Sequence, residues 1–159
     1  EIMENASLLY DLGAESIDYL DIVYLLVQDY RADPIDKSKA ILWATMNRHV
    51  GLVRLLLSDP LLDLSDNEAI QYASYDGCIE TVRILLEDGR LNPAINNNQA
   101  IIYATQKGHA EIVKLLLQDT RVDPTDQNNM VVLSTIKLGL TEILKILLQD
   151  PRFSYLHRL

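Results

Sequence analysis

The chain of 159 residues has little of several features that mark particular classes of protein. Its single cysteine, Cys78, excludes an internal disulfide and gives no indication of an oxidising compartment. No apolar run is long enough to cross a bilayer, so we expect no membrane partner. The first residues also lack the basic and apolar regions of a signal peptide. Together these absences predict an intracellular, cytoplasmic protein.

Basic residues are also scarce. Lys and Arg number 14 against 23 Asp and Glu, which gives a formal net charge of −9. The imbalance is concentrated in residues 1–38, which hold nine acidic residues and two basic ones. Because no basic stripe is visible, we expect no nucleic-acid partner. The acidic segment is either a solvated face or a docking surface for a basic partner.

What the sequence does contain is an internal repeat of about 30 residues. Runs of three aliphatic residues recur at offsets of 29, 31 and 31 residues, and a looser copy lies 30 residues before the first. Columns of small residues, glycines and aspartates keep the same offsets, and a fixed period of this length indicates a solenoid. The runs begin at Leu25, Leu55, Ile84, Leu115 and Ile146; the columns are Ala44, Ala73, Ala104 and Thr135, then Arg48, Gly77, Gly108 and Gly139, then Asp59, Asp88, Asp119 and Asp150.

Each repeat unit reads as two helices joined by a tight turn. Small and apolar residues spaced i, i+1, i+4 and i+5 from Ala100 predict a first helix with a narrow face that a neighbouring helix can approach. Gly108 is expected to end this helix in the left-handed conformation. A second helix is predicted from Ala110 to about Gln118, followed by a loop from Asp119 to Asn129 that is rich in turn-forming residues.

These segments resemble the ankyrin repeat family. The stretch "GHAEIVKLLL" at 108–117 is similar to the second-helix signature of that family, and weaker copies lie at 77–86, 139–148 and 48–57. The resemblance implies an all-α, helix-turn-helix solenoid of about five repeats. The period is shorter than the usual ankyrin length of about 33 residues, so we expect short loops in place of full β-hairpins. A single domain over 1–159 is predicted, with approximate repeats at 5–38, 39–67, 68–98, 99–129 and 130–159.

The repeats also depart from the family pattern. The first helix usually opens on Thr-Pro-Leu-His, but the matching segments here begin with Lys39, Glu68, Gln99 and Met130. We therefore expect the Thr and His hydrogen bonds that brace adjacent ankyrin units to be absent. Shortened repeats of this kind are similar to those of giant DNA viruses and protists, which suggests a location within a host cell.

Histidines and aspartates recur with the repeat instead of converging on one point. His49 and His109 share a column in which the family uses histidine to brace the turn, and this spacing is too wide for one metal ion. Asp29 belongs to the same column, and Asp29, Asp88, Asp119 and Asp150 are each followed two residues later by arginine, a pattern typical of turns after helix C-termini. Since phosphate loops, nucleophile elbows and metal motifs are also missing, we expect no enzyme activity, no metal and no other cofactor.

Two columns of the first helices vary from unit to unit as a recognition surface would, and an aromatic column precedes them on the same helices. The resemblance implies that this helix lines the concave surface, where aromatic residues are frequent binding hot spots. The aromatic column is either part of that surface or packed as core between adjacent first helices. The predicted partner-binding residues are Trp43, Tyr72 and Tyr103, then Met46, Tyr75 and Gln106, then Asn47, Asp76 and Lys107.

The function expected from these features is a non-catalytic, monomeric scaffold that binds a protein partner through the concave first-helix surface, and the partner is basic if the acidic segment is a docking surface. The alternative is a structural module, a segment of a longer repeat array that self-associates or packs on neighbouring domains. Exposed apolar surface on a terminal repeat would favour the alternative, because a capping repeat needs a polar outer face.

Overall fold

The computed structural model describes residues 34–64 and 68–153, apart from the side chains of residues 34–38 and 128. These residues form eight helices and no β-strand, which confirms the all-α fold class. The chain divides into two compact units, Glu1–Asn67 and Glu68–Leu159. Most of the predicted repeat 5–38 and most of the acidic segment lie outside the described residues, as does the third histidine of the sequence, His157.

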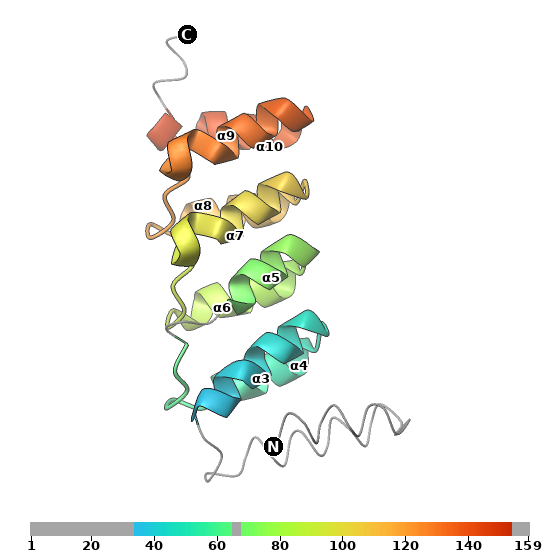
Figure 1. The fold of residues 1–159 in the computed structure, drawn as a ribbon, viewed down its shortest axis with the longest axis vertical. Coiled ribbons are helices and arrows are strands. Elements are labelled where there is room, and N and C mark those ends of the chain that lie inside the picture. Colours follow the sequence, from blue (N-terminus) through green and yellow to red (C-terminus); the bar gives the residue numbers. More distant parts are fainter. Residues whose placement is uncertain (1–33, 65–67, 154–159) are drawn as a thin grey trace. The chain divides into compact units, whose positions relative to one another are not determined.

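The helices come in pairs along the chain (Figure 1). The described part of the first unit is one pair, α3 (Pro34–Met46) and α4 (Val50–Leu57). The second unit holds three pairs, each within or close to one predicted repeat. They are α5 (Ala69–Asp76) with α6 (Ile79–Asp88), α7 (Ile95–Gln106) with α8 (Ala110–Gln118), and α9 (Asp126–Leu138) with α10 (Thr141–Gln149).

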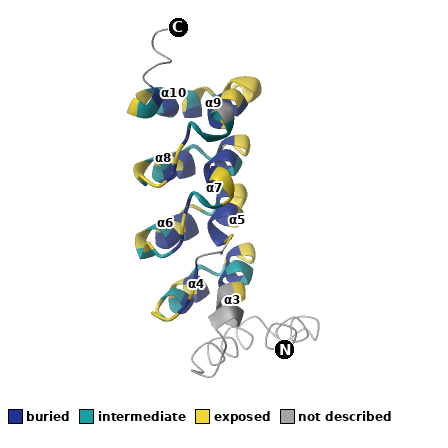
Figure 2. Cartoon of the chain, turned by 60° about the vertical axis from the view of Figure 1, so that its left-hand side comes forward, coloured by how far each residue is buried: buried dark blue, intermediate teal, exposed yellow. Residues whose placement is uncertain are grey.

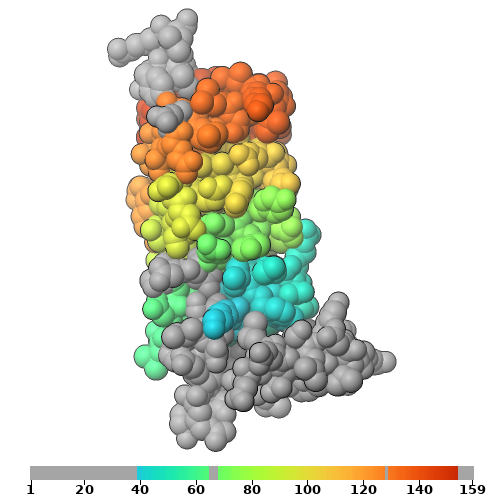
Figure 3. All heavy atoms as spheres, in the orientation of Figure 1, coloured from blue at the N-terminus to red at the C-terminus, as the bar shows by residue number. Residues whose placement is uncertain are grey.

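In the second unit the three pairs stack in register, as a solenoid requires. The first helices α5, α7 and α9 form one layer and the second helices α6, α8 and α10 form the other, with buried residues between them (Figure 2). The pairs form successive bands of colour in the space-filling view (Figure 3). The middle pair is therefore covered on two sides by its neighbours, which is how repeat proteins build a continuous core.

Small side chains allow this close stacking of the first helices. Ala73 and Ala104 of the small-residue column are fully buried, as is Ala100 one turn earlier on α7. The second helices supply larger apolar groups, and Val113 and Leu116 of α8 are fully buried. Leu115 and Leu117, which the sequence pattern also places inward, are only half-buried. The core therefore consists of small residues on one layer and aliphatic residues on the other.

The turn within each pair is a Schellman-type helix end. Gly77, Gly108 and Gly139 have φ of 76°, 78° and 67°, which confirms the predicted left-handed glycine. The next residue donates its N–H to the carbonyl of the small-residue column, as from His109 to Ala104 at 2.8 Å. Arg48 occupies the glycine column in the first unit and takes the same conformation, with φ of 59°.

The loops between pairs carry a second left-handed turn. Asn96, Asn97 and Asn98 have φ of 54°, 58° and 60°, a region that asparagine tolerates better than most residues. Helix α7 therefore starts at Ile95, whereas its right-handed part starts at Gln99, where the sequence pattern places the repeat boundary. Asn98 is buried; its Oδ1 accepts from the Asp123 N–H at 2.8 Å and its Nδ2 donates to Asp126 at 2.9 Å. This side chain ties one interhelical loop to the next.

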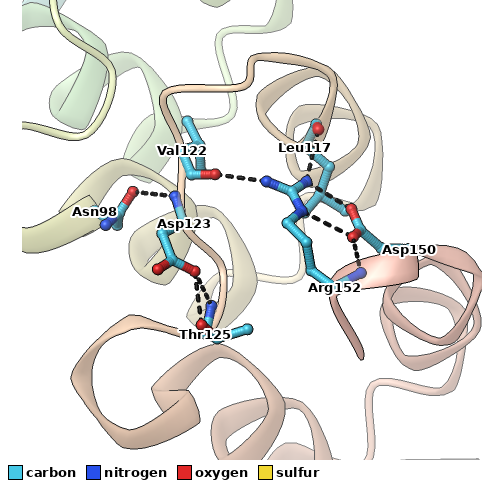
Figure 4. A network of polar contacts seen from close by, with 7 residues as sticks. All are labelled: Asn98, Leu117, Val122, Asp123, Thr125, Asp150 and Arg152. Carbon is cyan, nitrogen blue, oxygen red and sulfur yellow. Dashed lines mark hydrogen bonds and ion pairs between the residues drawn. The ribbon is translucent and has the colours of Figure 1, made fainter. Parts of the chain in front are cut away.

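Arginines make a further set of ties between successive loops. Arg152 forms a two-bonded ion pair with Asp150, and the same guanidinium donates to the carbonyls of Val122 (2.6 Å) and Leu117 (2.8 Å) in the preceding repeat (Figure 4). Arg121 repeats the arrangement with Asp119 and with the carbonyls of Gly89 and Leu91, each at 3.0 Å. The turn role predicted for the Asp-x-Arg sequence is confirmed, whereas the bridge to the preceding repeat is not indicated by the sequence.

These ion pairs affect the titration of the carboxylates. The hydrogen bonds from Arg152 lower the pKa of Asp150 below its ordinary value of 3.8, and those from Arg121 do the same for the pKa of Asp119. A carboxylate with a lowered folded-state pKa binds fewer protons when folded than when unfolded. Such a carboxylate therefore contributes its full stabilisation at pH values above the ordinary pKa of 3.8. This stabilisation is lost as the pH falls through the lowered pKa of the folded state.

We expect Gly77→Ala to destabilise the protein more than Gly139→Ala. Both changes place a Cβ on a left-handed residue, which costs about 1 kcal/mol. At Gly77 the new Cβ would also lie 2.7 Å from Cε1 of His109, whereas at Gly139 nothing lies within 4 Å. Overpacking of this kind typically costs a further 1–3 kcal/mol or so. Urea unfolding followed by circular dichroism measures both; equal losses would contradict the close approach of His109 to Gly77.

We also expect Asp150→Asn to destabilise the protein at pH 7 but much less at pH 3. At neutral pH the variant loses the charged partner of Arg152, while at pH 3 the unfolded wild-type chain is protonated at this residue and the advantage of the ionised carboxylate shrinks. Urea unfolding of both proteins at the two pH values gives the difference in unfolding free energy. A difference that is the same at pH 3 and pH 7 would show that the ion pair does not act through the lowered pKa.

Candidate functional site

The predicted binding residues of the second unit lie on the layer of first helices. Tyr72 and Tyr75 of α5 are 41% and 43% exposed, while Tyr103 of α7 is half-buried. Asp76, Gln106 and Lys107 are exposed at the ends of the same helices. Tyr72 is therefore exposed and does not pack as core, whereas Tyr103 is only partly buried between its neighbours. Figure 3 views the second unit from the side of these helices.

Three of these side chains contact one another. The rings of Tyr75 and Tyr103 meet edge to face, with centroids 5.6 Å apart and planes inclined by 83°. This is a favoured geometry, because the positive edge of one ring meets the negative face of the other. The ammonium of Lys107 lies 4.1 Å from the centroid of the Tyr75 ring, within the range of a cation–π interaction. Residues from two repeats are thus joined into one cluster.

A cleft of about 390 Å³ opens between α5 and α7 beside this cluster. Tyr72, Tyr75 and Tyr103 line it together with four polar side chains, and the Asn96 amide donates to Oε1 of Glu68 at 3.1 Å across it. Nε2 of Gln71 is buried and has no hydrogen-bond partner among the described residues. The polar lining residues are Glu68, Gln71, Asn96 and Gln99.

These four polar residues were not among the predicted site residues, although a signal for two of them was present. Glu68 and Gln99 share a repeat column and precede Tyr72 and Tyr103 by four residues. Residues four apart lie on the same face of a helix, so each tyrosine has a polar neighbour toward the N-terminus. The positions of Gln71 and Asn96 depend on the neighbouring repeat and on a left-handed turn, and no local pattern indicates them.

A second cleft of about 400 Å³ lies along α9, with Gln106 of α7 as a further lining residue, and is more apolar. Its polar lining on α9 is Lys137, one repeat after Gln106, and Ser134, which is buried and lies one repeat after Tyr103. Its apolar lining consists of Met130, Leu133 and Leu138. The surface of the first helices therefore changes along the second unit from aromatic and polar to aliphatic.

The remaining predicted site residues belong to the first unit. Met46 and Asn47 are exposed at the end of α3, and the Asn47 amide donates to the Trp43 carbonyl at 2.9 Å. The Trp43 ring is half-buried against the ring of His49, with centroids 5.5 Å apart. That Trp43, Met46 and Asn47 share one binding surface with the second unit remains a prediction.

The histidine of the second unit has a structural contact. His109 Nε2 lies 3.1 Å from the carbonyl oxygen of Tyr75, so the ring donates a hydrogen bond to the preceding repeat. This agrees with the predicted bracing role, and it places His109 directly against the backbone of a cleft residue. In the part of the chain that the structure describes, no three potential ligands gather as a metal site, and no helix is long and apolar enough to span a membrane.

Comparison with known families gives two matches to this architecture. A family model described as ankyrin repeats (three copies) matches residues 12–97, and one described as ankyrin repeat matches residues 96–129. No curated protein and no solved structure matches the chain. Ankyrin repeats are generally non-catalytic protein–protein interaction modules. With its stacked helix pairs and left-handed glycine turns, this chain belongs to the ankyrin repeat family.

Proposed function

We propose that this chain is a non-catalytic scaffold that binds a protein partner through the surface of its first helices. The observation that carries the proposal is the cluster of Tyr72, Tyr75 and Tyr103 around one cleft. Tyrosines provide a large contact area at low conformational cost, and residues of this kind dominate binding hot spots. Family membership supports the same general role, because ankyrin repeats generally bind proteins.

The framework around the cluster favours a preformed surface. His109 holds the Tyr75 carbonyl, and Asn98 with the arginine bridges joins the loops on the opposite edge of the same repeats. A surface held in place before binding loses little conformational entropy when the partner arrives. Because the described loops form no β-hairpin, the helical surface supplies most of the contact area available to the partner.

The lining of the cleft also favours binding over catalysis. It contains no cysteine, serine or histidine that would act as a nucleophile or as its general base. Its charged residue is Glu68, whose carboxylate is held by the Asn96 amide. We further propose that the acidic residues 1–38 steer a basic partner toward the protein, an effect that added salt would weaken.

We expect Tyr72→Ala and Tyr103→Ala each to weaken partner binding by at least about 1 kcal/mol while the helical content is retained. Partners are first captured from the native host by pull-down with mass spectrometry, and affinities are then measured by titration calorimetry. Charge reversal at Glu111 and Lys114, which are exposed on α8 in the other layer, is the matched control and should change little. If charge reversal at Glu111 and Lys114 abolishes binding and the tyrosine variants bind normally, the site lies on the second helices instead.

A second candidate function is assembly, and the last described repeat favours it. Leu133 and Ile136 of α9 are 55% and 60% exposed, whereas the equivalent residues of α7, Ile102 and Thr105, are 3% and 0% exposed. In α7 this face has α9 beside it, whereas the described residues contain no further first helix beyond α9. An uncovered stacking face of this kind is expected to pack on another repeat. The occupant we consider is a second copy of this chain.

If assembly is the function, light scattering across a concentration series will show self-association that Ile136→Glu abolishes, because the new charge would be buried at the contact. Lys114→Glu, on the exposed side of α8, is the control and should leave association unchanged. A protein that stays monomeric at every concentration contradicts assembly through a second copy and leaves the scaffold as the remaining function.

A further inference from the structure

The cleft between α5 and α7 has the chemistry of a site for one kind of side chain. We propose that it binds an arginine side chain of the partner, with the guanidinium between Glu68 and the rings of Tyr72 and Tyr103. This inference rests on the proposed function, since it names what the same surface recognises. Two features of the cleft carry it: the charge of its lining and its aromatic faces.

The first feature is the charge of the lining. Glu68 is the one carboxylate among the seven lining residues, and no lining residue is cationic. The Asn96 amide donates to its Oε1 at 3.1 Å, which fixes the carboxylate at the cleft while leaving Oε2 to accept from a ligand. A planar guanidinium presents several N–H donors, so it suits a carboxylate next to aromatic rings better than a compact ammonium does.

The second feature is that one of the tyrosines already binds a cation. The Lys107 ammonium occupies one face of the Tyr75 ring at 4.1 Å from its centroid. Tyr72 and Tyr103 line the same cleft, and no lining residue supplies a cation to their rings. Guanidinium groups stack on tyrosine faces by the same attraction, which strengthens as the pair is removed from water. An arginine of the partner would thus make with Tyr72 and Tyr103 the kind of cation–π contact that Lys107 makes with Tyr75.

Other classes of side chain fit this cleft less well. An acidic side chain would meet the Glu68 carboxylate, and like charges at contact distance repel. An aliphatic side chain would remove water from the exposed polar groups of Glu68 and Asn96 without replacing their hydrogen bonds. Aliphatic groups fit instead the neighbouring cleft of Met130, Leu133 and Leu138. The two clefts thus select different side chains of one partner.

The test compares two peptides that differ only in charge. The full 159-residue chain, labelled with ¹⁵N, is titrated with Ac-Ala-Ala-Arg-Ala-Ala-NH₂ and with the same peptide carrying citrulline, the neutral isostere of arginine. We expect the arginine peptide to shift the amide resonances of α5 and α7 around the cleft and to bind about tenfold or more tightly than the citrulline peptide. Citrulline keeps N–H donors but loses the positive charge that pairs with Glu68 and is attracted to the tyrosine rings. Equal binding of the two peptides would overturn the proposal.

Variants locate the interaction. Glu68→Gln keeps an oxygen that can accept from Asn96 but removes the charge, so it should abolish the preference for arginine over citrulline. Glu111→Gln, on the exposed side of α8, is the matched control and should keep that preference. The proposal is also overturned if the Glu68→Gln variant still prefers the arginine peptide to the citrulline peptide, or if the peptides shift only resonances of α8.

Failure of arginine recognition and failure of the proposed function give different results. If neither peptide shifts the resonances of the cleft, arginine recognition is wrong. If Tyr72→Ala nevertheless weakens binding of the captured partner, the binding surface stands and only its selected side chain is different. If the peptides behave as expected but the tyrosine variants leave partner binding unchanged, the cleft recognises arginine and the partner contacts another surface.

Discussion

Burial of one helix pair against the next is the interaction on which the described structure depends. A single ankyrin-like pair has an apolar layer too thin to form a core alone, and its stability comes from its neighbours. The fully buried Ala73 and Ala104 make this possible, because side chains of one carbon let the first helices of adjacent repeats approach closely. The same constraint leaves Leu133 and Ile136 of α9 exposed, because the described residues contain no further repeat to cover them.

Polar ties between loops supplement that burial. The described loops have no β-hairpin ladder, so their backbone groups need other partners. Asn98 takes up one N–H of the following loop, while Arg121 and Arg152 donate to carbonyls of the loop before them. Each arginine is held in turn by its own aspartate, which fixes the guanidinium in the direction of those carbonyls. The repeats are thereby kept in register at the edge farthest from the glycine turns.

The proposed binding face follows from these two constraints. The small-residue, glycine and aliphatic columns are needed for packing and turns. Positions that can vary therefore lie on the outer side of the first helices, where Tyr72, Tyr75 and Lys107 are found. His109 connects the two sets, because its ring supports the Tyr75 carbonyl from the following repeat. Recognition and stability would therefore use neighbouring residues of the same helices, and a cleft arises where two repeats meet.

The sequence by itself determined the helix pairs, the left-handed glycine turns and the Asp-x-Arg pairs, because each depends on residues close together in the chain. It also indicated the columns that hold Tyr72 and Tyr103. Only the tertiary structure decided that Tyr75 lies against Tyr103, that Gln71 and Asn96 line the same cleft, and that Arg152 reaches Leu117 and Val122. These contacts join residues of different repeats, and the period of the sequence gives the order of the repeats but not the distance or rotation between them.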